Sequence, residues 1–590
     1  MRRTITPMML ACLVLAGLPW TALGDDQAAP VGDPEAESPT LHCIGVAWLI
    51  AGDDNRNAHV DLSYRAAGSV AWNAAMPLFR VERGASGGEA GDARVVVPAG
   101  TWLFAGSIMF LDSGAEYELR LSLADPDGGT AERTLLARTA VEPMEPANAR
   151  VSHVVPGNGG GSGSLADPYR GLAEAQRSVS AGTIVLVHAG VYWGTFEIQR
   201  SGEPGSPTVW RGAGDGPAVI DGRTSEGGPW GPRGIWASDA HDVWFEDLTI
   251  RNADWGLVAH DAARVVVRRC RFENTKNGIT STRNSRDDCR GLFISDNVLQ
   301  GPLKWPRAEG VEIEEDRGIQ VTGSGHVVCY NRISGFKDGI DTFPSSRCEA
   351  IDIHNNDISE CLDDGTEMDG SYRNTRCFLN RYTNVFQGIS TQPVYGGPVY
   401  IVRNVLYNVQ AEPLKLHNSP SGAIALHNTC VKQGMPEAIW TTDPVRNCVF
   451  RNNLFVGTDD KYTAEFLPPM VDCDFDYDGF ALVKCTNFLK WNDVRYPTID
   501  DVRASAPVER HATVMDAVTL FASGLLPPAD YRVRVEPSAS DARLAMGTAA
   551  VDAGEVLPGV NDGFAGQAPD LGALELGADL PHYGPRTPTR

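Results

Sequence analysis

The chain has 590 residues, with 75 acidic against 51 basic side chains and a formal charge of −24 at pH 7. This acidity argues against nucleic acid and anionic membrane surfaces as partners, although a local basic groove for an anionic glycan is compatible with it. The 12 cysteines show no Cys-x-x-Cys spacing, so no zinc site is predicted.

The first 24 residues have the order of a cleaved secretory signal. Met1-Arg2-Arg3 precedes an apolar run over residues 8–20, and Ala22-Leu23-Gly24 follows it. The run is shorter than the ~20 apolar residues of a membrane helix, and no later stretch reaches that length. We therefore expect residues 1–24 to be removed, and the mature protein to be secreted or periplasmic without inserting into a membrane.

Residues 25–39 are rich in proline and glutamate and predict a spacer. Residues 40–147 alternate as short antiparallel strands do, for example in Glu116-Tyr117-Glu118-Leu119-Arg120-Leu121. The length near 100 residues, the early Trp48 and the Leu111, Gly114 and Tyr117 corner predict a small β-sandwich. This stretch resembles a fibronectin type III domain, which implies a structural or glycan-presenting role.

Residues 151–460 contain a repeat with a period in the twenties. Its turn asparagine recurs, for example, 24 residues apart at Asn356, Asn380, Asn404 and Asn428. Valine, isoleucine and phenylalanine fill the repeats in place of helix formers, which predicts a β-solenoid whose stacked turns share one core. We expect the asparagines to form a side-chain ladder at a tight turn.

The opening Asp167-Pro168-Tyr169, the repeats and the closing segments Tyr477-Asp478-Gly479-Phe480 and Ala568–Glu575 resemble the right-handed parallel β-helix of the pectate-lyase-like superfamily. The resemblance implies an all-β fold, a right-handed parallel β-helix preceded by the small β-sandwich. It also implies a secreted enzyme that degrades polysaccharides. Residues 461–590 are then expected to form a cap and tail packed on the β-helix, covering its open strand edge.

Four successive repeats place polar residues at equivalent positions. Because side chains alternate along a strand and neighbouring strands lie ~4.8 Å apart, two stacked columns are expected on one outward face. The first column reads Asp341, Glu367, Ser390 and Lys415, and the second reads Phe343, Asp369, Gln392 and His417.

Asp341, Glu367 and Asp369 are expected within ~5–7 Å of each other by this stacking. Three carboxylates so close cannot all ionise unaided, so they share protons or bind a cation. Oxygen ligands in an extracellular setting favour Ca²⁺, with Asp364 as a fourth ligand and Asp338 and Asp363 as further candidates. A solvated acidic ladder without a ligand is the alternative.

Calcium-dependent β-helix lyases cleave uronate polysaccharides by β-elimination, and the spacing Glu367-Met368-Asp369 is similar to the acidic ligands of some of them. The resemblance implies a lyase in which the metal acidifies the C5 proton and a neutral amine removes it. Lys415 is the candidate base, and His417 and Tyr395 are candidate proton donors. Candidate substrate-binding residues are Arg373, Arg376, Gln392 and Tyr395.

The same acids also fit a glycoside hydrolase. Glu367 with Asp369 suits the ~6.5–9.5 Å of inverting enzymes, and Asp341 with Glu367 suits the ~5–5.5 Å of retaining ones. Asp363-Asp364-Gly365 is similar to the paired acids of polygalacturonase-like enzymes, whose Gly-His-Gly and Arg-x-Lys motifs are absent here. C5 epimerisation shares the first step of the lyase, and a non-catalytic glycan-binding solenoid is a third alternative.

Overall fold

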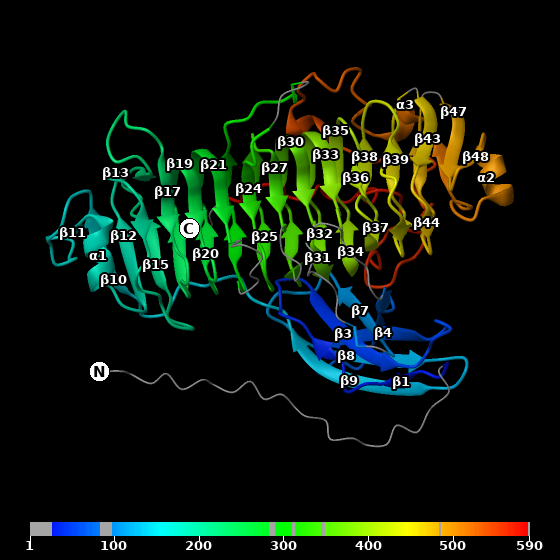
Figure 1. Ribbon diagram of the computed structural model, residues 1–590, viewed down its shortest axis with the longest axis horizontal. Coiled ribbons are helices and arrows are strands. Elements are labelled where there is room, and N and C mark those ends of the chain that lie inside the picture. Colours follow the sequence, from blue (N-terminus) through cyan, green and yellow to red (C-terminus); the bar gives the residue numbers. More distant parts are fainter. Residues whose placement is uncertain are drawn as a thin grey trace.

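The computed structural model describes residues 26–82, 97–98, 100–281, 289–308, 313–343, 348–458, 460–482 and 485–587. The predicted signal segment lies outside these residues. The described chain forms a small β-sandwich followed by a long β-solenoid (Figure 1). Among the described residues, helices are too short or too polar to cross a bilayer.

The amino-terminal part consists of two antiparallel sheets packed face to face. One sheet contains β1 (Ala29–Pro30), β2 (Glu35–Ala36), β3 (Ile44–Ala51), β6 (Phe79–Val81) and β7 (Thr101–Ile108); the other contains β4 (His59–Ala66), β5 (Asn73–Ala74), β8 (Glu116–Ala124) and β9 (Thr130–Arg138). Trp48, Phe104 and Leu121 are buried between them. Tyr117 Oη accepts a hydrogen bond from Asp112 N at 3.0 Å, the corner that the sequence predicts. The β-sandwich is therefore present, and its assignment to the fibronectin type III domains stays a prediction.

The spacer predicted for residues 25–39 is partly a strand of this sandwich. Ala29–Pro30 pairs with Ile50–Ala51, and Glu35–Ala36 pairs with Val46–Ala47. The structure therefore shows two short strands where the sequence predicts a spacer. Each strand is only two residues long, and proline cannot donate to a sheet ladder, so no alternating pattern shows in the sequence.

The solenoid is right-handed and is built from two long parallel sheets, as predicted. Within the described residues the first contains β10 (Arg150–Val155), β11 (Tyr169–Arg170), β12 (Thr183–Val187), β15 (Thr208–Gly212), β18 (Val243–Glu246), β20 (Val266–Arg268), β22 (Phe293–Ser295), β25 (Val327–Cys329), β29 (Asp352–His354), β32 (Thr375–Phe378), β34 (Tyr395–Val402), β37 (Ser421–Leu426), β40 (Val445–Arg446), β41 (Val449–Arg451), β44 (Met470–Val471) and β45 (Asp474–Asp476).

The second parallel sheet bends, so each turn of the solenoid has three faces. It contains β13 (Gly190–Trp193), β14 (Phe196–Glu197), β16 (Ala218–Asp221), β17 (Gly231–Trp236), β19 (Thr249–Val258), β21 (Arg271–Thr280), β23 (Val298–Gln300), β24 (Arg317–Gln320), β26 (Arg332–Ser334), β27 (Asp338–Asp341), β30 (Asp357–Glu367), β33 (Arg381–Ser390), β35 (Val405–Val409), β36 (Leu414–Lys415), β38 (Thr429–Val431), β42 (Leu454–Val456), β46 (Gly479–Ala481) and β49 (Thr513–Met515). The first half of β30 pairs with β26 and its second half pairs with β27.

The predicted asparagine ladder is confirmed inside the turn between these sheets. Asn380 Oδ1 accepts hydrogen bonds from both Asn356 N and Asn356 Nδ2 at 2.9 Å, and Asn380 Nδ2 donates to Ile353 O at 2.9 Å. Asp478 takes the next place, where its Oδ1 accepts from Asn453 N at 2.7 Å. The solenoid therefore continues one turn past the predicted boundary at residue 460, because a carboxylate replaces the marker amide.

Replacing one ladder residue is expected to destabilise the solenoid. In Asn380→Ala the donors of Asn356 and the carbonyl of Ile353 lose a partner in a dry interior, at about 1–3 kcal/mol for each unsatisfied group. We expect a loss of about 3 kcal/mol in the free energy of unfolding, measured by denaturant titration. Asn73→Ala, at an exposed position of β5, is the control and should change little; equal stabilities of the two variants would contradict the ladder's role.

Both ends of the solenoid are covered. At the amino-terminal end, α1 (Leu172–Ser178) buries Leu172 and Ala175 against the first turns. The carboxy-terminal end carries β39 (Glu437–Ile439), β43 (Asp460–Phe466), β47 (Cys485–Trp491), β48 (Val494–Tyr496) and α2 (Ile499–Ser505). After α3 (Ala517–Leu520) and the 3₁₀ turn η1 (Pro537–Ala539), the tail runs back along the solenoid until Arg586 pairs with Asp296 at 2.7 Å (Figure 1).

The β-sandwich packs on the side of the solenoid (Figure 1). Ser107 N donates to Tyr400 Oη at 3.0 Å, and Ser107 Oγ donates to Asn374 Oδ1 at 2.9 Å. The short strands β28 (Cys348–Glu349) and β31 (Ser371–Arg373) lie next to this contact. The two parts of the chain are thus joined by buried polar contacts, which determine the position of several residues predicted for the site.

Candidate functional site

One motif recurs on the third face of the solenoid. A variable residue is followed by glycine, a mostly apolar residue and a second variable residue; the copies are Arg233–Trp236, Trp255–Val258, Asn277–Thr280, Arg317–Gln320, Asp338–Asp341, Asp364–Glu367 and Gln387–Ser390. A Cβ atom on Gly339 would lie 2.5 Å from Gly365 O, so only glycine allows the turns to stack this closely. The third residue, such as Ile340, lies in the core. The first and fourth residues form two columns.

The register confirms the first predicted column. Asp341 pairs with Glu367, Glu367 pairs with Ser390, and Ser390 pairs with Lys415. However, Asp341, Asp369 and Lys415 are buried, and Glu367 is partly exposed. The prediction of an outward patch is therefore wrong, because the acidic and basic side chains of neighbouring turns fold onto each other.

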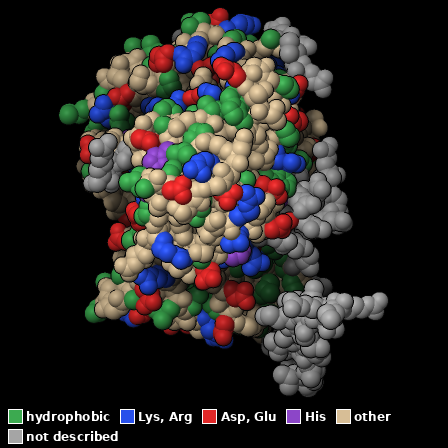
Figure 2. All heavy atoms as spheres, turned by 90° about the vertical axis from the view of Figure 1, so that its left-hand side faces the viewer, with side chains coloured by type: hydrophobic (Ala, Val, Ile, Leu, Met, Phe, Trp, Pro, Cys, Tyr) green, Lys and Arg blue, Asp and Glu red, His purple; other side chains and the backbone are tan. Residues whose placement is uncertain are grey.

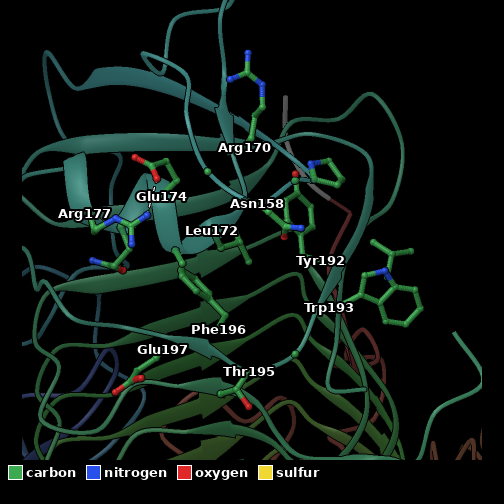
Figure 3. A pocket seen from close by; sticks show the side chains of 18 of the residues that line it. Asn158, Arg170, Leu172, Glu174, Arg177, Tyr192, Trp193, Thr195, Phe196 and Glu197 are labelled. Atoms are coloured by element: carbon green, nitrogen blue, oxygen red, sulfur yellow. Dashed lines mark hydrogen bonds and ion pairs between the residues drawn. The ribbon is translucent and has the colours of Figure 1, made fainter. Parts of the chain in front are cut away.

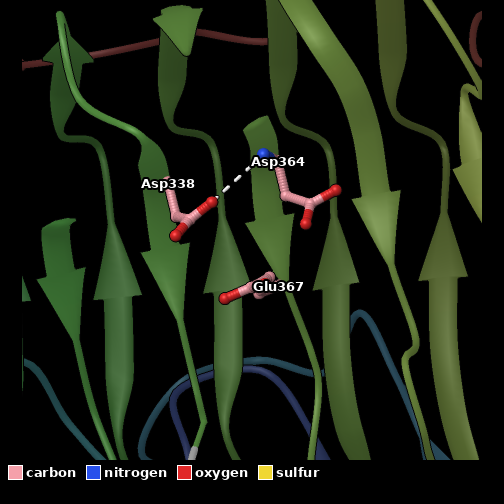
Figure 4. A group of neighbouring side chains, drawn as sticks. All are labelled: Asp338, Asp364 and Glu367. Atoms are coloured by element: carbon pink, nitrogen blue, oxygen red, sulfur yellow. Dashed lines mark hydrogen bonds between the residues drawn. The ribbon is translucent and has the colours of Figure 1, made fainter. Parts of the chain in front are cut away.

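Three carboxyl groups converge at the centre of this face. Asp338, Asp364 and Glu367 each place one oxygen within 4.8 Å of the others (Figure 4). Asp338 also accepts a hydrogen bond from Asp364 N at 3.2 Å. Asp338 Oδ2, Asp364 Oδ1 and Glu367 Oε2 have no hydrogen-bond partner among the described residues. We call these three residues the acid centre.

Two cations and two further acids flank the acid centre. Lys415 Nζ lies 2.8 Å from Asp364 Oδ2, and Arg317 Nε lies 2.5 Å from Asp341 Oδ2. Asp369 Oδ1 accepts hydrogen bonds from Ser390 Oγ at 2.7 Å and from the backbone of Gln392. Asp341 and Asp369 thus accept hydrogen bonds from neighbouring groups, whereas each residue of the acid centre keeps one oxygen without a partner among the described residues.

Five carboxyl groups therefore face two cations, an excess of three negative charges if all ionise. Burial, and then the neighbouring acids, raise the pKa of Asp338 and Glu367 well above the usual range. Burial raises the pKa of Asp364 to about 6 although Lys415 lowers it, and raises that of Asp369 to about 8. Asp338, Glu367 and Asp369 thus retain protons at neutral pH unless a cation is bound, whereas Asp364 is largely ionised.

The same charges contradict the predicted role of Lys415 as a neutral base. Burial lowers the pKa of Lys415, but Asp364 and Asp369 outweigh burial and raise the pKa overall. With these partners Lys415 is an ammonium ion, and an ammonium ion cannot accept a proton. Its position supports a different role, which is to hold Asp364 as a carboxylate.

The raised pKa values predict that the protein loses stability as the pH rises. The folded-state values of about 6 for Asp364 and about 8 for Asp369 exceed the ~4 of an unfolded aspartate. The folded protein thus holds protons that the unfolded chain has released, and the free energy of unfolding falls between pH ~4 and ~8. Thermal unfolding across this window measures the slope. The change of stability with pH should be smaller in Asp369→Asn than in the wild type. Equal slopes in the two proteins would contradict the raised pKa of Asp369.

Three residues predicted to bind substrate lie instead under the β-sandwich. Arg376 is fully buried, with Nε 2.5 Å from Asp352 Oδ1. Tyr395 is 1 % exposed and packs in a cluster with Leu103 and Ala105. Arg373 pairs with Glu37 and Glu349. The predictions for Arg376, Tyr395 and Arg373 are wrong because these side chains fix the sandwich to the solenoid.

Of the two remaining predicted residues, the structure places Gln392 at the site and His417 away from the acid centre. Gln392 lies at the site: its backbone donates to Asp369, and its Oε1 atom has no partner among the described residues. His417 Nε2 lies 2.8 Å from Glu412 Oε2, so its nearest acid is outside the acid centre. The role of proton donor proposed for His417 therefore has no geometric support here.

The predicted site does not contain Arg317 or Gln320. It names Asp338 only as a further candidate ligand, whereas the structure places Asp338 at the centre. Gln320 Nε2 donates to Asp341 Oδ2 at 2.8 Å, next to Arg317. The insertion before β24 lengthens this repeat, which hides the strand when asparagine spacing alone is followed. The sequence Arg317-Gly318-Ile319-Gln320 matches Asp338-Gly339-Ile340-Asp341, and this match is the signal that identifies the strand.

Comparison with known proteins agrees with the solenoid. The family model described as "Right handed beta helix region" matches residues 233–393, which include the whole acid centre. The "Uncharacterized protein YwoF" of Bacillus subtilis (strain 168) is 31% identical over 90 residues, which are 15% of this chain. The matched part spans 19% of that relative's own length, so the two chains share a segment.

Solved structures with a similar chain course include a family 28 exopolygalacturonase of Yersinia enterocolitica. It has 12% sequence identity and a TM-score of 0.28, covering 79% of this chain and 100% of that chain. The catalytic domain of a GH87 α-1,3-glucanase in complex with nigerose has 11% identity and a TM-score of 0.19, covering 76% of this chain and 94% of that chain. At these scores the likeness carries no argument about chemistry.

Proposed function

We propose that the protein is a secreted enzyme that cleaves a polysaccharide by hydrolysis at the acid centre. The observation that carries the proposal is the convergence of Asp338, Asp364 and Glu367 within 4.8 Å, with an unpartnered oxygen on each. Among these three, Glu367 has exposed surface, whereas Asp338 and Asp364 are fully buried. Of the three, Glu367 is therefore proposed as the residue that meets the substrate.

Glu367 is assigned as the general acid. Desolvation and four neighbouring carboxyl groups keep its proton bound at neutral pH. In the reaction this proton passes to the glycosidic oxygen as the bond from that oxygen to the anomeric carbon breaks. The leaving sugar then departs as a neutral alcohol.

Asp364 is assigned as the carboxylate that stabilises the transition state. Burial raises its pKa to about 6, but Lys415 at 2.8 Å favours its charged form. The charged form stabilises the positive charge that develops on the anomeric carbon. Glu367, left as a carboxylate when the sugar departs, takes a proton from water as the new C–O bond forms. Two carboxyl groups with different environments thereby supply a proton and a fixed negative charge.

A calcium-assisted lyase is the second candidate, favoured by one distance. The three oxygens lie within 4.8 Å of one another, close enough to share one ion at the ~2.4 Å of a calcium–oxygen bond, and carboxylates are ligands that Ca²⁺ prefers. Asp338, Asp364 and Glu367 would hold the ion, with Asp341 and Asp369 beside them. A bound cation neutralises the carboxylate of a uronate and thereby acidifies its C5 proton.

Removing divalent cations is expected to leave cleavage unchanged, because hydrolysis needs the three carboxyl groups and no metal. The mature protein is incubated with polygalacturonate, alginate, chondroitin sulfate and a neutral glucan, with added calcium or with a chelator. New reducing ends and ultraviolet absorbance are recorded together. We expect reducing ends without absorbance under both conditions. Absorbing, unsaturated products that require calcium would support the lyase instead.

A further inference from the structure

A cavity of about 670 Å³ lies at the amino-terminal end of the solenoid, between α1 and strands β13 and β14 (Figure 3). Leu172 and Phe196 contribute apolar surface, and the ion pair between Glu174 and Arg177 lies at one side. Gln176 also lines it, with an Oε1 atom that is buried and has no partner among the described residues. The volume is in the range of sites for small ligands, ~300–1,000 Å³.

The cavity opens on the same face as the acid centre. Thr195, which lines it, donates a hydrogen bond from Oγ1 to Arg233 O at 3.0 Å. Glu197, which also lines it, pairs in register with Trp236. Arg233 and Trp236 are the first and fourth residues of the glycine motif whose later copies carry the acids. The cavity therefore lies at the start of the two columns that run through the acid centre.

Large aromatic side chains are exposed around this cavity. Trp193 on its wall is 42% exposed, Trp230 before β17 is 39% exposed, and Trp255 on β19 is 37% exposed. Trp193 lines the cavity, and Trp255 pairs in register with Arg233, whose carbonyl accepts a hydrogen bond from the cavity residue Thr195. Exposed aromatic surface on neighbouring turns beside a cavity is typical of a binding site.

Two of the rings in this region are held by arginines. The Arg233 guanidinium lies 4.1 Å from the centre of the Trp236 ring, and the Arg223 guanidinium lies 5.6 Å from that of Trp193. Asp221 in turn holds Arg223 through two hydrogen bonds, at 2.8 and 2.7 Å. Such stacking restricts the ring orientation before any ligand arrives, which lowers the entropy cost of binding.

The chemistry of this surface fits a sugar. Acidic and basic side chains are interspersed over this end of the molecule, so no field of one sign selects an ion (Figure 2). A sugar ring has an apolar C–H face that packs on an aromatic ring, and hydroxyl groups that pair with charged and amide side chains. Trp193, Trp255 and the polar groups of the cavity supply both kinds of contact.

We infer that this cavity and the exposed tryptophans form a second polysaccharide-binding surface, which holds a remote part of the polymer that reaches the acid centre. The inference rests on the proposed function for the identity of the ligand. Four motif steps separate Arg233 from Asp338, about 19 Å at ~4.8 Å per turn. A substrate must therefore extend several sugar residues beyond the cleaved bond to use both regions.

The test measures binding without cleavage. The dissociation constants of the four polysaccharides named above are determined by calorimetry on Glu367→Gln, alone and combined with Trp193→Ala or Trp255→Ala. We expect each tryptophan replacement to weaken binding of at least one polymer about tenfold, as loss of one aromatic contact does. Trp255→Phe keeps a ring and should retain most of the affinity, which separates ligand contact from folding damage.

Trp72→Ala is the matched control. Trp72 lies in the β-sandwich and is stacked by Arg65 at 4.4 Å, as Trp193 is stacked by Arg223. Its replacement should leave binding unchanged. Equal affinities in the Trp193, Trp255 and Trp72 variants would overturn the inference, while cleavage by the wild type would still support the proposed function. Weakened binding in a wild type that cleaves nothing would remove the proposed function and leave the surface. Loss of self-association in the Trp193 variant, seen by ultracentrifugation, would assign the surface to a second copy and overturn the inference.

Discussion

Replacing Glu367 by glutamine is expected to lower the rate of polysaccharide cleavage by about 10²- to 10⁴-fold, the usual contribution of a general acid. The amide keeps the shape of the side chain but has no proton acidic enough for a leaving glycosidic oxygen. The amide also removes one of five crowded carboxyl groups, so we expect the variant to fold and to be at least as stable as the wild type near pH 8. Initial rates of reducing-end formation and thermal unfolding measure the two effects.

The control for this variant is Glu273→Gln. Glu273 is a partly exposed glutamate on β21, on another face of the same bent sheet. It should cleave at the wild-type rate. A Glu367→Gln protein that folds and retains wild-type activity would show that the acid centre does not perform the cleavage. A matching loss in Asp364→Asn would assign the charged partner as well, because that change removes the carboxylate held by Lys415.

Replacing Arg376 by methionine is expected to destabilise the protein by about 3–5 kcal/mol, since it leaves Asp352 as an unpaired charge in a buried site. Both side chains are 0% exposed, and Arg376 also donates to Ser107 Oγ at 3.0 Å across the contact with the β-sandwich. Denaturant titration measures the loss. Because the same bonds join the two parts of the chain, we also expect the sandwich to become more accessible to proteolysis.

A double variant separates the buried charge from the packing. Arg376→Met with Asp352→Leu removes both charges and should recover most of the loss, since apolar pairs often replace buried ion pairs without penalty. Arg332→Met is the control: the Arg332 side chain is 55% exposed, and its partner Asp357 keeps a second arginine, Arg381, at 3.0 Å, so we expect a loss of only ~0–1 kcal/mol. A single Arg376 variant as stable as this control would contradict the role of the buried pair.

The solenoid and its columns can be predicted from the sequence because each turn stacks on the preceding one, which makes equivalent residues of successive repeats neighbours in space. Asp341, Glu367, Ser390 and Lys415 lie 26, 23 and 25 residues apart and follow from aligning the repeats, and the register confirms them. The same rule extends the ladder to Asp478, provided that a carboxylate is accepted in place of an amide. The glycine motif would also have placed Asp338 beside Asp364.

The docking of the β-sandwich could not be predicted by counting. It buries Arg376 and Tyr395 through contacts between residues nearly 300 positions apart, such as Ser107 with Tyr400. One local signal was present: Asp352 and Arg376 occupy neighbouring positions in register, and opposite charges stacked on adjacent strands indicate a structural pair. An arginine with such a partner is a poor candidate for binding substrate.

The state of Lys415 also depends on information that the sequence does not contain. The column predicts the distance of Lys415 from Glu367 along the axis. The partner of its ammonium group, however, is Asp364, which is the first residue of its glycine motif and lies two turns away. Burial of the site then determines which groups carry protons. Burial makes the carboxyl groups weak acids, and their charge in turn keeps the lysine protonated.

The most direct test of the proposed hydrolysis is cleavage in water enriched in ¹⁸O, with the polysaccharide that the wild type degrades and with mass spectrometry of the first products. Hydrolysis transfers one oxygen from water to each new reducing end, whereas β-elimination transfers none. Product incubated without enzyme corrects for exchange. We predict one heavy oxygen per cleavage in the wild type and no product in Glu367→Gln. Unsaturated products without heavy oxygen would contradict the account and establish elimination.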